Sequence, residues 1–552
     1  MASQGLDQDT LDMLLDTLQR FSDRQMPPEK LLELDAKNEF PKPLIEEMLG
    51  PDIGLHLLFI PEEQEGLGGG AYDVYRVSEA MARTDLGIAT AFLAIFLGTD
   101  PIVVGGTEAQ KQKWMSKIAE GRIVAYAVTE PLAGSELSNI KTRAERVMEG
   151  DRITGYKLNG AKQFITNGSV ASIYTVLAMA PDGPTFFVVE GGTEGFEPGK
   201  HEDKHGIRSS DTSPISIEDV FVPVENLLGD VEGKGLIHAQ SVFGFTRLMV
   251  AAFGLGGGDA AMKRAIRYSR ERIQAGSPLC EKPGYTHKLI VPHVTTLEAC
   301  RAYTVETARR LDAGEPELQT EGAIAKLLAT EAGNAAADAA VQAHGGYGYI
   351  REYQVEKIRR DVRITTIYEG TSEIMEWTIS RDRWRTHLQQ KGEFYRQMAS
   401  RLETLHREDD AVGASVAALA LRALLETVER ARAARLTRHQ HHLFRLGELM
   451  AKAEVAANFS LYAAGKGSER YAAYFAPKAL KAMARVYARE TALTIAEGSI
   501  RMLRGGDAVS PVEMPQLERD LGLTAINSAM GGQVADLDEV ARAINEQDAE
   551  AE

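Results

Sequence analysis

The 552-residue sequence has only two cysteines, Cys280 and Cys300, and their spacing excludes a cysteine-based metal site. So little cysteine is typical of a reducing compartment. Positive charge is also scarce: the net charge of -17 argues against general affinity for nucleic acid or an anionic membrane surface. No apolar signal core or Arg-rich transit pattern opens the chain, and the longest apolar run, residues 86–97, is too short to span a bilayer. These absences predict a cytoplasmic protein.

What is present indicates a large globular protein of several domains, with 44% hydrophobic and 26% charged residues. Apolar periodicity predicts helices from residue 9 to about residue 122, including a nearly all-apolar helix over 86–99. Short β-type runs separated by turn residues then predict a small antiparallel sheet or barrel. These runs are residues 124–128, 153–158, 163–166, 174–178, 185–189 and 215–221. Helices return over residues 235–274, 291–311 and 318–343, and again from Ser372.

The segment after about Lys391 is alanine-rich and amphipathic, which predicts further helices. It loosely repeats earlier sequence, because residues 501–508 resemble the Gly-Gly helix stop of 341–348. The repeat continues with an Arg-Asp pair, but it has no counterpart of the carboxylate at Glu369. We interpret this tail as a degenerate second helical bundle. Chance similarity between two Gly-Gly helix stops is the alternative.

Residues 361–373 place Glu369 beside a glycine, between an apolar run and the helix-opening pair Thr371-Ser372. A helix that starts at Ser372 directs its free N–H groups toward Glu369 and anything bound beside it. A carboxylate in this position can act as a general base when it is buried with a substrate. The alternative is an ordinary first-turn acid, favoured by the helix dipole.

Two further segments follow predicted strands and carry groups suited to a flat ring. The loop 129–135, Thr-Glu-Pro-Leu-Ala-Gly-Ser, offers backbone N–H groups and hydroxyls that can bind a heteroaromatic ring or a phosphate. Phe164 and Thr166 add an aromatic face beside a hydroxyl. Each segment alone is also an ordinary turn signal.

Taken together, in this order and spacing, these segments resemble the acyl-CoA dehydrogenase family over about the first 385 residues. The matching stretches are residues 60–63, 126–135, 164–166, 342–346 and 368–374. The resemblance implies a multi-domain α+β fold that is mainly α, with FAD between barrel and bundle. The implied domains are an N-terminal helical domain (1–122), a middle antiparallel β-barrel (123–233), a four-helix bundle with the catalytic base (234–388) and a C-terminal helical extension (389–552).

The resemblance implies that Glu369 takes the α-proton of an acyl-CoA thioester while the β-hydrogen leaves as hydride to flavin N5, giving the trans-2-enoyl thioester. Some family members take their base from the first bundle helix, but Phe245-Thr246-Arg247 at that place has no carboxylate. Arg272 is expected to reach the FAD pyrophosphate of a neighbouring subunit. The residues assigned to the cofactor are Val128, Thr129, Ser135, Phe164, Ile165, Thr166, Arg272, Gln342, Gly345, Gly346, Thr371 and Glu373. The residues assigned to the substrate are Ser135, Thr246, Arg247, Tyr368 and Gly370. Plain helix packing is the alternative for Thr246 and Arg247.

The sequence departs from the family pattern at Leu132, where glycine is usual, and at Ala275, where an aromatic residue is usual. The tail resembles that of the very-long-chain branch, in which a second bundle covers a tetramer surface, and this favours a homodimer. Residues 86–97 contain no cation, which favours an apolar acyl group. Peripheral membrane contact through the tail stays open.

The expected electron acceptor is an electron-transferring flavoprotein. One alternative is an oxidase of the same fold that uses oxygen. The other is a catalytically silent flavoprotein scaffold that binds DNA or an assembly partner. The tail contains a basic cluster that could contact DNA. Its acidic neighbours favour an exposed, salt-bridged face instead. The cluster consists of Arg422, Arg430, Arg432, Arg435 and Arg438.

Overall fold

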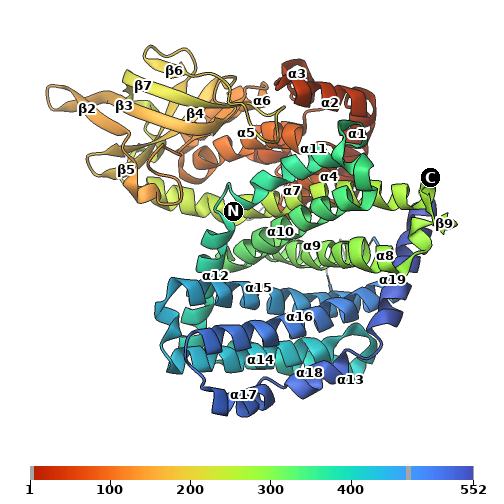
Figure 1. Ribbon diagram of the computed structural model, residues 1–552. Coiled ribbons are helices and arrows are strands. Elements are labelled where there is room, and N and C mark those ends of the chain that lie inside the picture. Colours follow the sequence, from red (N-terminus) through yellow and green to blue (C-terminus); the bar gives the residue numbers. More distant parts are fainter. Residues whose placement is uncertain (1–4, 317, 468–473, 551–552) are drawn as a thin grey trace. The chain divides into compact units, whose positions relative to one another are not determined.

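The computed structural model describes residues 5–316, 318–467 and 474–550 (Figure 1). The chain forms two compact units, which are described separately. Unit 1 comprises Met1–Gly257, Leu311–Glu315 and Arg360–Ile364. Unit 2 comprises Gly258–Arg310, Pro316–Arg359 and Thr365–Glu552.

The first part of unit 1 is helical, as predicted. Its α-helices are α1 (Gln8–Gln25), α2 (Pro28–Lys37), α3 (Lys42–Met48), α4 (Ala71–Thr84), α5 (Leu86–Gly105) and α6 (Glu108–Ala119). Helix α5 begins where the Asp85 carboxylate accepts the N–H of Ile88 at 2.9 Å. It continues through Pro101 to Gly105, beyond the end expected at residue 99.

This extension corrects the expectation that the apolar segment is too short to span a bilayer. At 20 residues α5 passes a length and composition test for a membrane span, but 83% of its most apolar window is buried in the protein. Among the described residues, the two parts of helix α7 (Gly235–Glu271), Gly235–Ser241 and Thr246–Glu271, pass the same test together, bent by 42°. The burial of α5 accounts for its composition, since a helix that is apolar all round must be covered on every side.

A curled seven-stranded sheet forms the rest of unit 1 (Figure 1). Its strands are β1 (Val124–Ala127), β2 (Arg143–Glu149), β3 (Arg152–Thr166), β4 (Ile173–Ala180), β5 (Gly183–Glu190), β6 (Phe196–Pro198) and β7 (Thr212–Pro223). The strand order is β1-β4-β2-β3-β7-β6, and β5 pairs with the other edge of β4. Most neighbours are antiparallel, whereas β4 runs parallel to both β1 and β2. The inner face buries aromatic pairs such as Tyr156 with Phe187 and Tyr174 with Phe196.

Three details of the sheet differ from the predicted strands, one of them being the short strand β6, which lies outside every predicted run. The runs 153–158 and 163–166 belong to one long strand, β3, interrupted by irregularities in its pairing with β7. Strand β2 was not predicted, because most of its side chains are polar and exposed and give no apolar alternation. The fold class is confirmed: the protein is mainly helical, with a curled β-sheet half-barrel in the middle.

Helix α7 (Gly235–Glu271) runs from unit 1 into unit 2 and is followed by a short hairpin, β8 (Ile273–Gln274) and β9 (Ser277–Pro278). The helices that follow are α8 (Pro283–Leu289), α9 (Val291–Asp312), α10 (Gln319–His344), α11 (Val355–Val362) and α12 (Ser372–Gln390). Helix α12 begins at the residue that the sequence predicted. Its N-cap is Thr371, whose Oγ1 accepts the N–H of Ile374.

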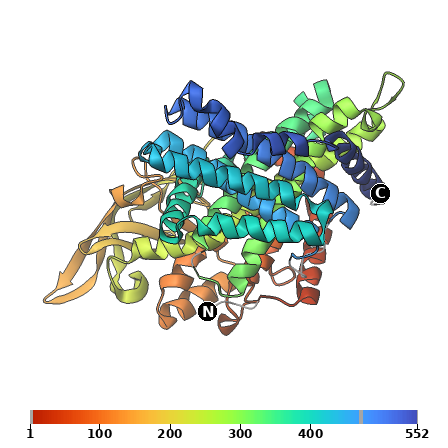
Figure 2. The ribbon, with the colours of Figure 1, turned by 90° about the horizontal axis from the view of Figure 1, so that it is seen from below.

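The tail forms a second set of helices within unit 2. They are α13 (Glu393–Glu408), α14 (Ala414–Ala433), α15 (Gln440–Ala463), α16 (Pro477–Gly505), α17 (Met514–Asp520), α18 (Leu523–Ala529) and α19 (Gln533–Glu550). Helices α14, α15 and α16 lie alongside one another (Figures 1 and 2). Alanines and glycines permit this close packing: a Cβ on Gly447 of α15 would lie 2.2 Å from the carbonyl oxygen of Glu376 in α12.

A buried polar network joins the tail to the first bundle. The Arg383 guanidinium of α12 donates to both carboxylate oxygens of Glu454 in α15, each at 2.7 Å, and to Glu321 of α10 at 3.1 Å. The hydroxyls of Tyr395 and Tyr303 also donate to Glu454, at 3.1 and 3.5 Å. All five residues are buried. The network fixes how α15 docks on α12, because a displaced partner would leave a buried charge uncompensated.

The basic cluster of the tail is a salt-bridged face. Three of its arginines pair with neighbouring carboxylates. These are Arg422 with Glu403, Arg430 with Glu426 and Asp520, and Arg432 with Glu429. Paired guanidiniums are less available to an external polyanion, so this face does not support the DNA-binding alternative.

Candidate functional site

A buried ion pair fixes the loop that follows β1. The Lys162 ammonium, fully buried, donates to Glu130 at 2.7 Å, to the Val128 carbonyl at 3.1 Å and to the Leu177 carbonyl at 2.6 Å. Burial alone would raise the pKa of Glu130, but Lys162 and nearby donors hold it below its usual value. The sequence prediction missed both residues. They position Val128 and Thr129, the first two residues assigned to the flavin.

The rest of this loop presents open backbone and a hydroxyl. Glu130 and Ala133 exchange backbone hydrogen bonds of 3.0 and 3.1 Å, which closes a tight turn. Ser135 is exposed, and an added Cβ on Gly134 would meet no atom within 4 Å. Leu132 is 74% exposed, so it leaves the turn intact. The loop can therefore approach a ring closely with its backbone and donate from Ser135.

A bulge near the end of β3 turns Phe164 outward. Pairing with β7 shifts between Lys162 and Ile165, and Phe164 has a left-handed φ of 57°. Its ring is 63% exposed, whereas the next residue, Ile165, is buried. The pairing resumes at Ile165, and Thr166, opposite Thr212, is half-buried. An aromatic ring exposed beside a hydroxyl suits stacking on a flat heteroaromatic group.

Asn167, which was not assigned a role, holds this strand end in place. Its side chain donates to the Ala91 carbonyl of α5 at 2.8 Å, and its backbone N–H donates to the Asp211 carbonyl at 3.0 Å. Asn167 also adopts a left-handed φ, of 61°. Asparagine tolerates this conformation better than most residues, which is the signal that could have identified it.

Thr246 and Arg247 lie on α7 and are both buried, at 0% and 7% exposure. The side chain of Phe245 is outside the described part of the structure. Burial fits the packing alternative as well as a substrate role, so the assignment of Thr246 and Arg247 stays a prediction.

Glu369 lies in a left-handed turn immediately before α12. Its φ is 53° and that of Gly370 is 91°, so two successive residues leave the usual backbone regions. The buried Lys326 of α10 donates to the Gly370 carbonyl at 2.6 Å and so anchors the turn. Glu369 itself is half-buried, as are Tyr368 and Gly370. A strained non-glycine conformation that neighbours hold in place is typical of functional sites.

The first turns of α12 carry several carboxylates. Ser372 donates to Glu331 of α10 at 2.5 Å, and Glu373 is exposed. Burial and the neighbouring carboxylates of Glu448 and Glu373 raise the pKa of Glu376 to about 7. In the described chain, no group of three or more His, Cys, Asp or Glu residues is arranged to hold a metal ion.

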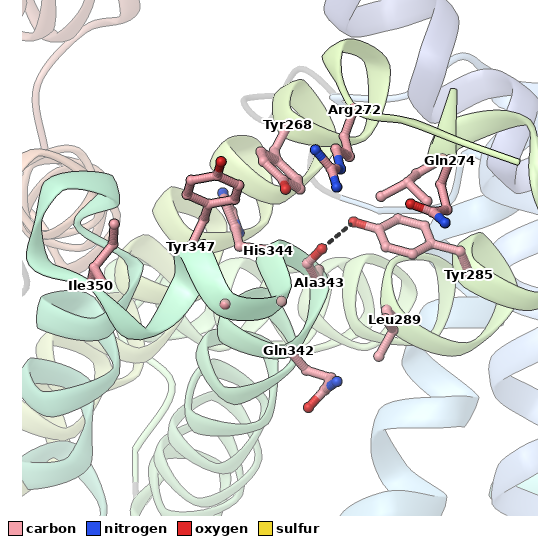
Figure 3. A pocket seen from close by; sticks show the side chains of 13 residues that line it. Tyr268, Arg272, Gln274, Tyr285, Leu289, Gln342, Ala343, His344, Tyr347 and Ile350 are labelled. Atoms are coloured by element: carbon pink, nitrogen blue, oxygen red, sulfur yellow. Dashed lines mark hydrogen bonds between the residues drawn. The ribbon is translucent and has the colours of Figure 1, made fainter. Parts of the chain in front are cut away.

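A pocket of about 630 Å³ lies within unit 2, at the junction of α7, the β8–β9 hairpin, α8 and the end of α10 (Figure 3). Four residues predicted to bind the cofactor line this pocket: Arg272, Gln342, Gly345 and Gly346. Tyr268, Tyr285, Leu289 and Tyr347 are among the other lining residues.

The pocket combines a cation with open backbone. The Arg272 side chain is exposed and makes no ion pair or hydrogen bond with any described residue. An added Cβ would meet nothing within 4 Å at Gly345, whose φ is 59°, or at Gly346. The Tyr285 hydroxyl donates to the Ala343 carbonyl at 3.1 Å and ties α8 to the end of α10. The pocket therefore offers a guanidinium, exposed backbone and aromatic faces to a ligand.

These features fit FAD. An exposed aromatic ring and hydroxyls at the end of β3 suit an isoalloxazine, and the guanidinium beside two open glycines suits a pyrophosphate and its adenosine. The first group of residues, from Val128 to Thr166, lies in unit 1. Arg272, the Gly345–Gly346 pair and the Glu369 turn lie in unit 2.

Comparison with known proteins identifies the family. Three family models match consecutive parts of the chain: the N-terminal domain of acyl-CoA dehydrogenase over residues 8–122, the middle domain over 125–220 and the C-terminal domain over 233–383. The short-chain specific acyl-CoA dehydrogenase of Megasphaera elsdenii is 39% identical over 364 residues, which cover 64% of this chain and 92% of that protein. A subunit of the caffeyl-CoA reductase-Etf complex of Acetobacterium woodii is 36% identical over 368 residues, or 65% of this chain and 94% of that one.

A solved structure also resembles the chain over its whole length. The acyl-CoA dehydrogenase of Bacillus anthracis, complexed with FAD, has a TM-score of 0.83 at 26% identity and covers 99% of this chain and 97% of its own. The tail beyond residue 383 thus has a structural counterpart in a relative. The predicted resemblance is confirmed: the chain belongs to the acyl-CoA dehydrogenase family and is an FAD-dependent acyl-CoA dehydrogenase.

Proposed function

We propose that the enzyme converts an acyl-CoA thioester to the trans-2-enoyl-CoA, with Glu369 as the base that removes the α-proton. The observation that carries this proposal is the left-handed turn at Glu369 and Gly370, which the buried Lys326 anchors. A base must be held at a fixed place above the α-carbon, and a turn of this kind fixes the carboxylate without a long flexible segment.

The α-hydrogen of a thioester is weakly acidic, so the chain has to lower the cost of removing it. The backbone N–H of Glu369 is our candidate donor to the thioester carbonyl, where negative charge develops. Exclusion of water would raise the basicity of the half-buried Glu369 toward what proton removal needs. Bound FAD supplies the acceptor for the β-hydrogen, which leaves as hydride.

The loop at the end of β1 and the bulge at Phe164 would form the cofactor side of the reaction. In this proposal Phe164 stacks on the ring, Thr166 hydrogen-bonds near N5, and Ser135 donates to ring or substrate. The Lys162–Glu130 pair would keep the β1 loop from moving as the ligand binds, since each ammonium hydrogen has a buried acceptor.

An anaerobic titration with acyl-CoA tests the proposal. The flavin absorption band of the wild-type protein should bleach as substrate is added, and the band of Glu369→Gln should not. Glu369→Gln should still bind acyl-CoA, seen as a shift of the band without bleaching. Equal bleaching in both proteins would contradict the role of Glu369.

We propose that the acyl group is apolar. Residues 86–97 of α5, which the family resemblance places near that group, contain no charged side chain, so a dicarboxyl thioester would lack a cation partner. Repeating the titration with acyl-CoA thioesters of increasing length, and with a dicarboxyl thioester, would define the substrate. Preferred bleaching by the dicarboxyl thioester would contradict an apolar site.

We propose an electron-transferring flavoprotein as the electron acceptor. Support comes from a relative that is named as part of an Etf complex. Rapid mixing of the reduced enzyme with air separates this function from that of an oxidase. Slow reoxidation by oxygen, together with fast reoxidation by an added electron-transferring flavoprotein, is the expected result.

We further propose a cytoplasmic homodimer. The tail packs on α12 through the Arg383–Glu454 network and so covers a face of the first bundle. Light scattering should give twice the mass of the chain, and four times that mass would contradict the proposal.

Cell fractionation should recover the protein in the cytoplasmic fraction. Membrane contact is tested separately, by flotation with lipid vesicles. In that experiment the protein should stay with the soluble fraction.

A further inference from the structure

The C-terminal helix α19 contacts the segment that links α7 to α9. The Arg270 guanidinium at the end of α7 donates to the backbone carbonyl of Asn545. The side-chain amide of Asn545 donates to the Cys280 carbonyl at 3.5 Å, and Asp538 lies 3.1 Å from Nε2 of His287 in α8. Figure 1 shows α19 beside α8 and β9 accordingly. Three polar contacts therefore tie α19 to this segment.

The same helix is anchored to the tail bundle at its other end. Asp536, near the start of α19, pairs with Arg485 and Arg489 of α16 at the centre of a largely buried cluster. Val540 and Ile544 lie one turn apart and are buried, at 0% and 3% exposure. Helix α19 thus bridges the tail bundle and the α7–α9 segment.

The segment that α19 holds also forms one wall of the pocket in Figure 3. Leu279 lines the pocket, precedes Cys280 and donates its backbone N–H to the Arg272 carbonyl at 3.0 Å. The hairpin that follows this arginine has only two residues in each strand, too few to be rigid alone. The position of the hairpin therefore depends on the elements that contact the residues at its base, and α19 is one of these elements.

We propose that α19 is a positioning element for the pocket of Arg272: it holds the hairpin in the conformation that binds the pyrophosphate of an adenine dinucleotide. The proposal rests on FAD as the cofactor of the proposed function and on the expectation that Arg272 binds its pyrophosphate. A wall that is ordered before the ligand arrives loses less conformational freedom on binding, so the attachment of α19 raises affinity. The tail then contributes to cofactor binding and not only to packing.

The test uses the full-length holoenzyme and a chain that ends at Asp536, made by Leu537→stop. This cut removes the three polar contacts of α19 with the α7–α9 segment and keeps Asp536 for Arg485 and Arg489. We expect the dissociation constant for FAD, measured by quenching of flavin fluorescence, to rise about tenfold, with circular dichroism reduced only by the helix that was removed. The double variant Asp538→Ala/Asn545→Ala keeps the helix and should weaken FAD binding in the same direction. Arg542→Ala, on the exposed face of α19 beside Glu539, is the matched control and should bind FAD as the wild type does.

Arg272→Ala separates a positioning role from general stabilisation. It should weaken FAD binding by itself, and adding the truncation to it should cost little more, because both changes act through the same side chain. A full tenfold cost of truncation in the Arg272→Ala background would overturn the proposal, as would wild-type affinity in the truncated chain and in the double variant. Wild-type affinity of Arg272→Ala alone would instead refute the role of Arg272, on which the proposal depends.

Discussion

The two sets of helices in unit 2, which we infer from the sequence to be a repeat, differ at the positions that carry chemistry. The first bundle ends α10 with Gly345 in a left-handed conformation and open space around Gly345 and Gly346. In the tail, α16 ends at Gly505, and a Cβ on the next residue, Gly506, would lie 2.8 Å from a side-chain carbon of Leu436. In the tail, a side chain therefore fills the space at the second glycine, whereas the first bundle leaves both glycines open.

The second difference concerns the turn that bears the carboxylate. In the repeat that we infer, Ser528 takes the place of Glu369, and it lies inside the regular helix α18. Glu369 instead follows a break in the helix and has a left-handed φ of 53°. A helical frame alone therefore does not make this kind of site. The site needs a carboxylate on an anchored, irregular turn and glycines that leave room for a ligand.

The largest expected effect is on kcat, when the first bundle loses its carboxylate. Glu369→Gln should lower kcat by about 10³-fold, because it removes the general base but keeps the volume of the side chain. Ser528→Ala in the tail is the matched control and should leave kcat unchanged. Steady-state kinetics with an electron-transferring flavoprotein check both. A loss of less than tenfold in Glu369→Gln would mean that another group takes the proton.

The next effect concerns the interface between α12 of the first bundle and α15 of the tail. Arg383→Met leaves Glu454 buried without its partner, and we expect the free energy of unfolding to fall by roughly 3–5 kcal/mol. Urea denaturation followed by circular dichroism measures the change. Arg381→Met removes an exposed arginine whose partner is the adjacent, half-buried Asp382, and should cost about 0.5 kcal/mol or less. Similar losses in the two variants would show that the buried network does not hold the tail.

A smaller effect compares a glycine of each bundle. Gly370 has a φ of 91°, and Gly370→Ala should cost about 1–2 kcal/mol of stability, because L-residues avoid this conformation. Gly505→Ala, at the end of α16, meets no atom within 4 Å and should be neutral or slightly stabilising. Thermal unfolding of the two variants gives the comparison. Wild-type stability of Gly370→Ala would argue against a turn that is held in the left-handed conformation.

The smallest effect is a pH dependence of stability at the interface between the two bundles. Burial and nearby carboxylates raise the pKa of Glu376 from 4.5 to about 7, so the folded state favours its protonated form. This stabilisation is fully present below pH 4.5 and is lost as the pH rises through 7. Glu376→Gln should therefore be more stable than the wild type at pH 8, by about 1 kcal/mol after allowance for solvent screening, and equal to it near pH 4.5. Urea titrations at the two pH values test this, and an equal difference at both would contradict it.

Much of the architecture follows from patterns along the chain, but local backbone geometry does not. Thr371-Ser372 predicted the start of α12 correctly, since a hydroxyl N-cap is a local signal. The left-handed conformations of Phe164 and Glu369 were not predictable, because neither residue type favours a positive φ and only tertiary contacts impose it. Strand β2 was missed because its exposed, charged side chains hide the period of a strand.

The candidate site shows the same limit. The assigned residues Arg272, Gln342, Gly345 and Gly346 line one pocket, although 70 residues separate the arginine from the glutamine. Lys162 and Glu130 were missed, because lysine is seldom fully buried and neither residue has a local signal for pairing across the sheet. Positioning side chains of this kind become visible only with the fold.

The measurement that tests the central claim most directly is exchange of the α-hydrogen of a bound thioester with deuterated solvent. The ligand is an acyl-CoA analogue that cannot lose its β-hydrogen, so proton removal is observed without oxidation, by mass spectrometry. Wild-type holoenzyme should introduce deuterium at the α-carbon, and Glu369→Gln, loaded equally with FAD, should not. Exchange at the wild-type rate in Glu369→Gln would contradict the assignment of Glu369 as the base.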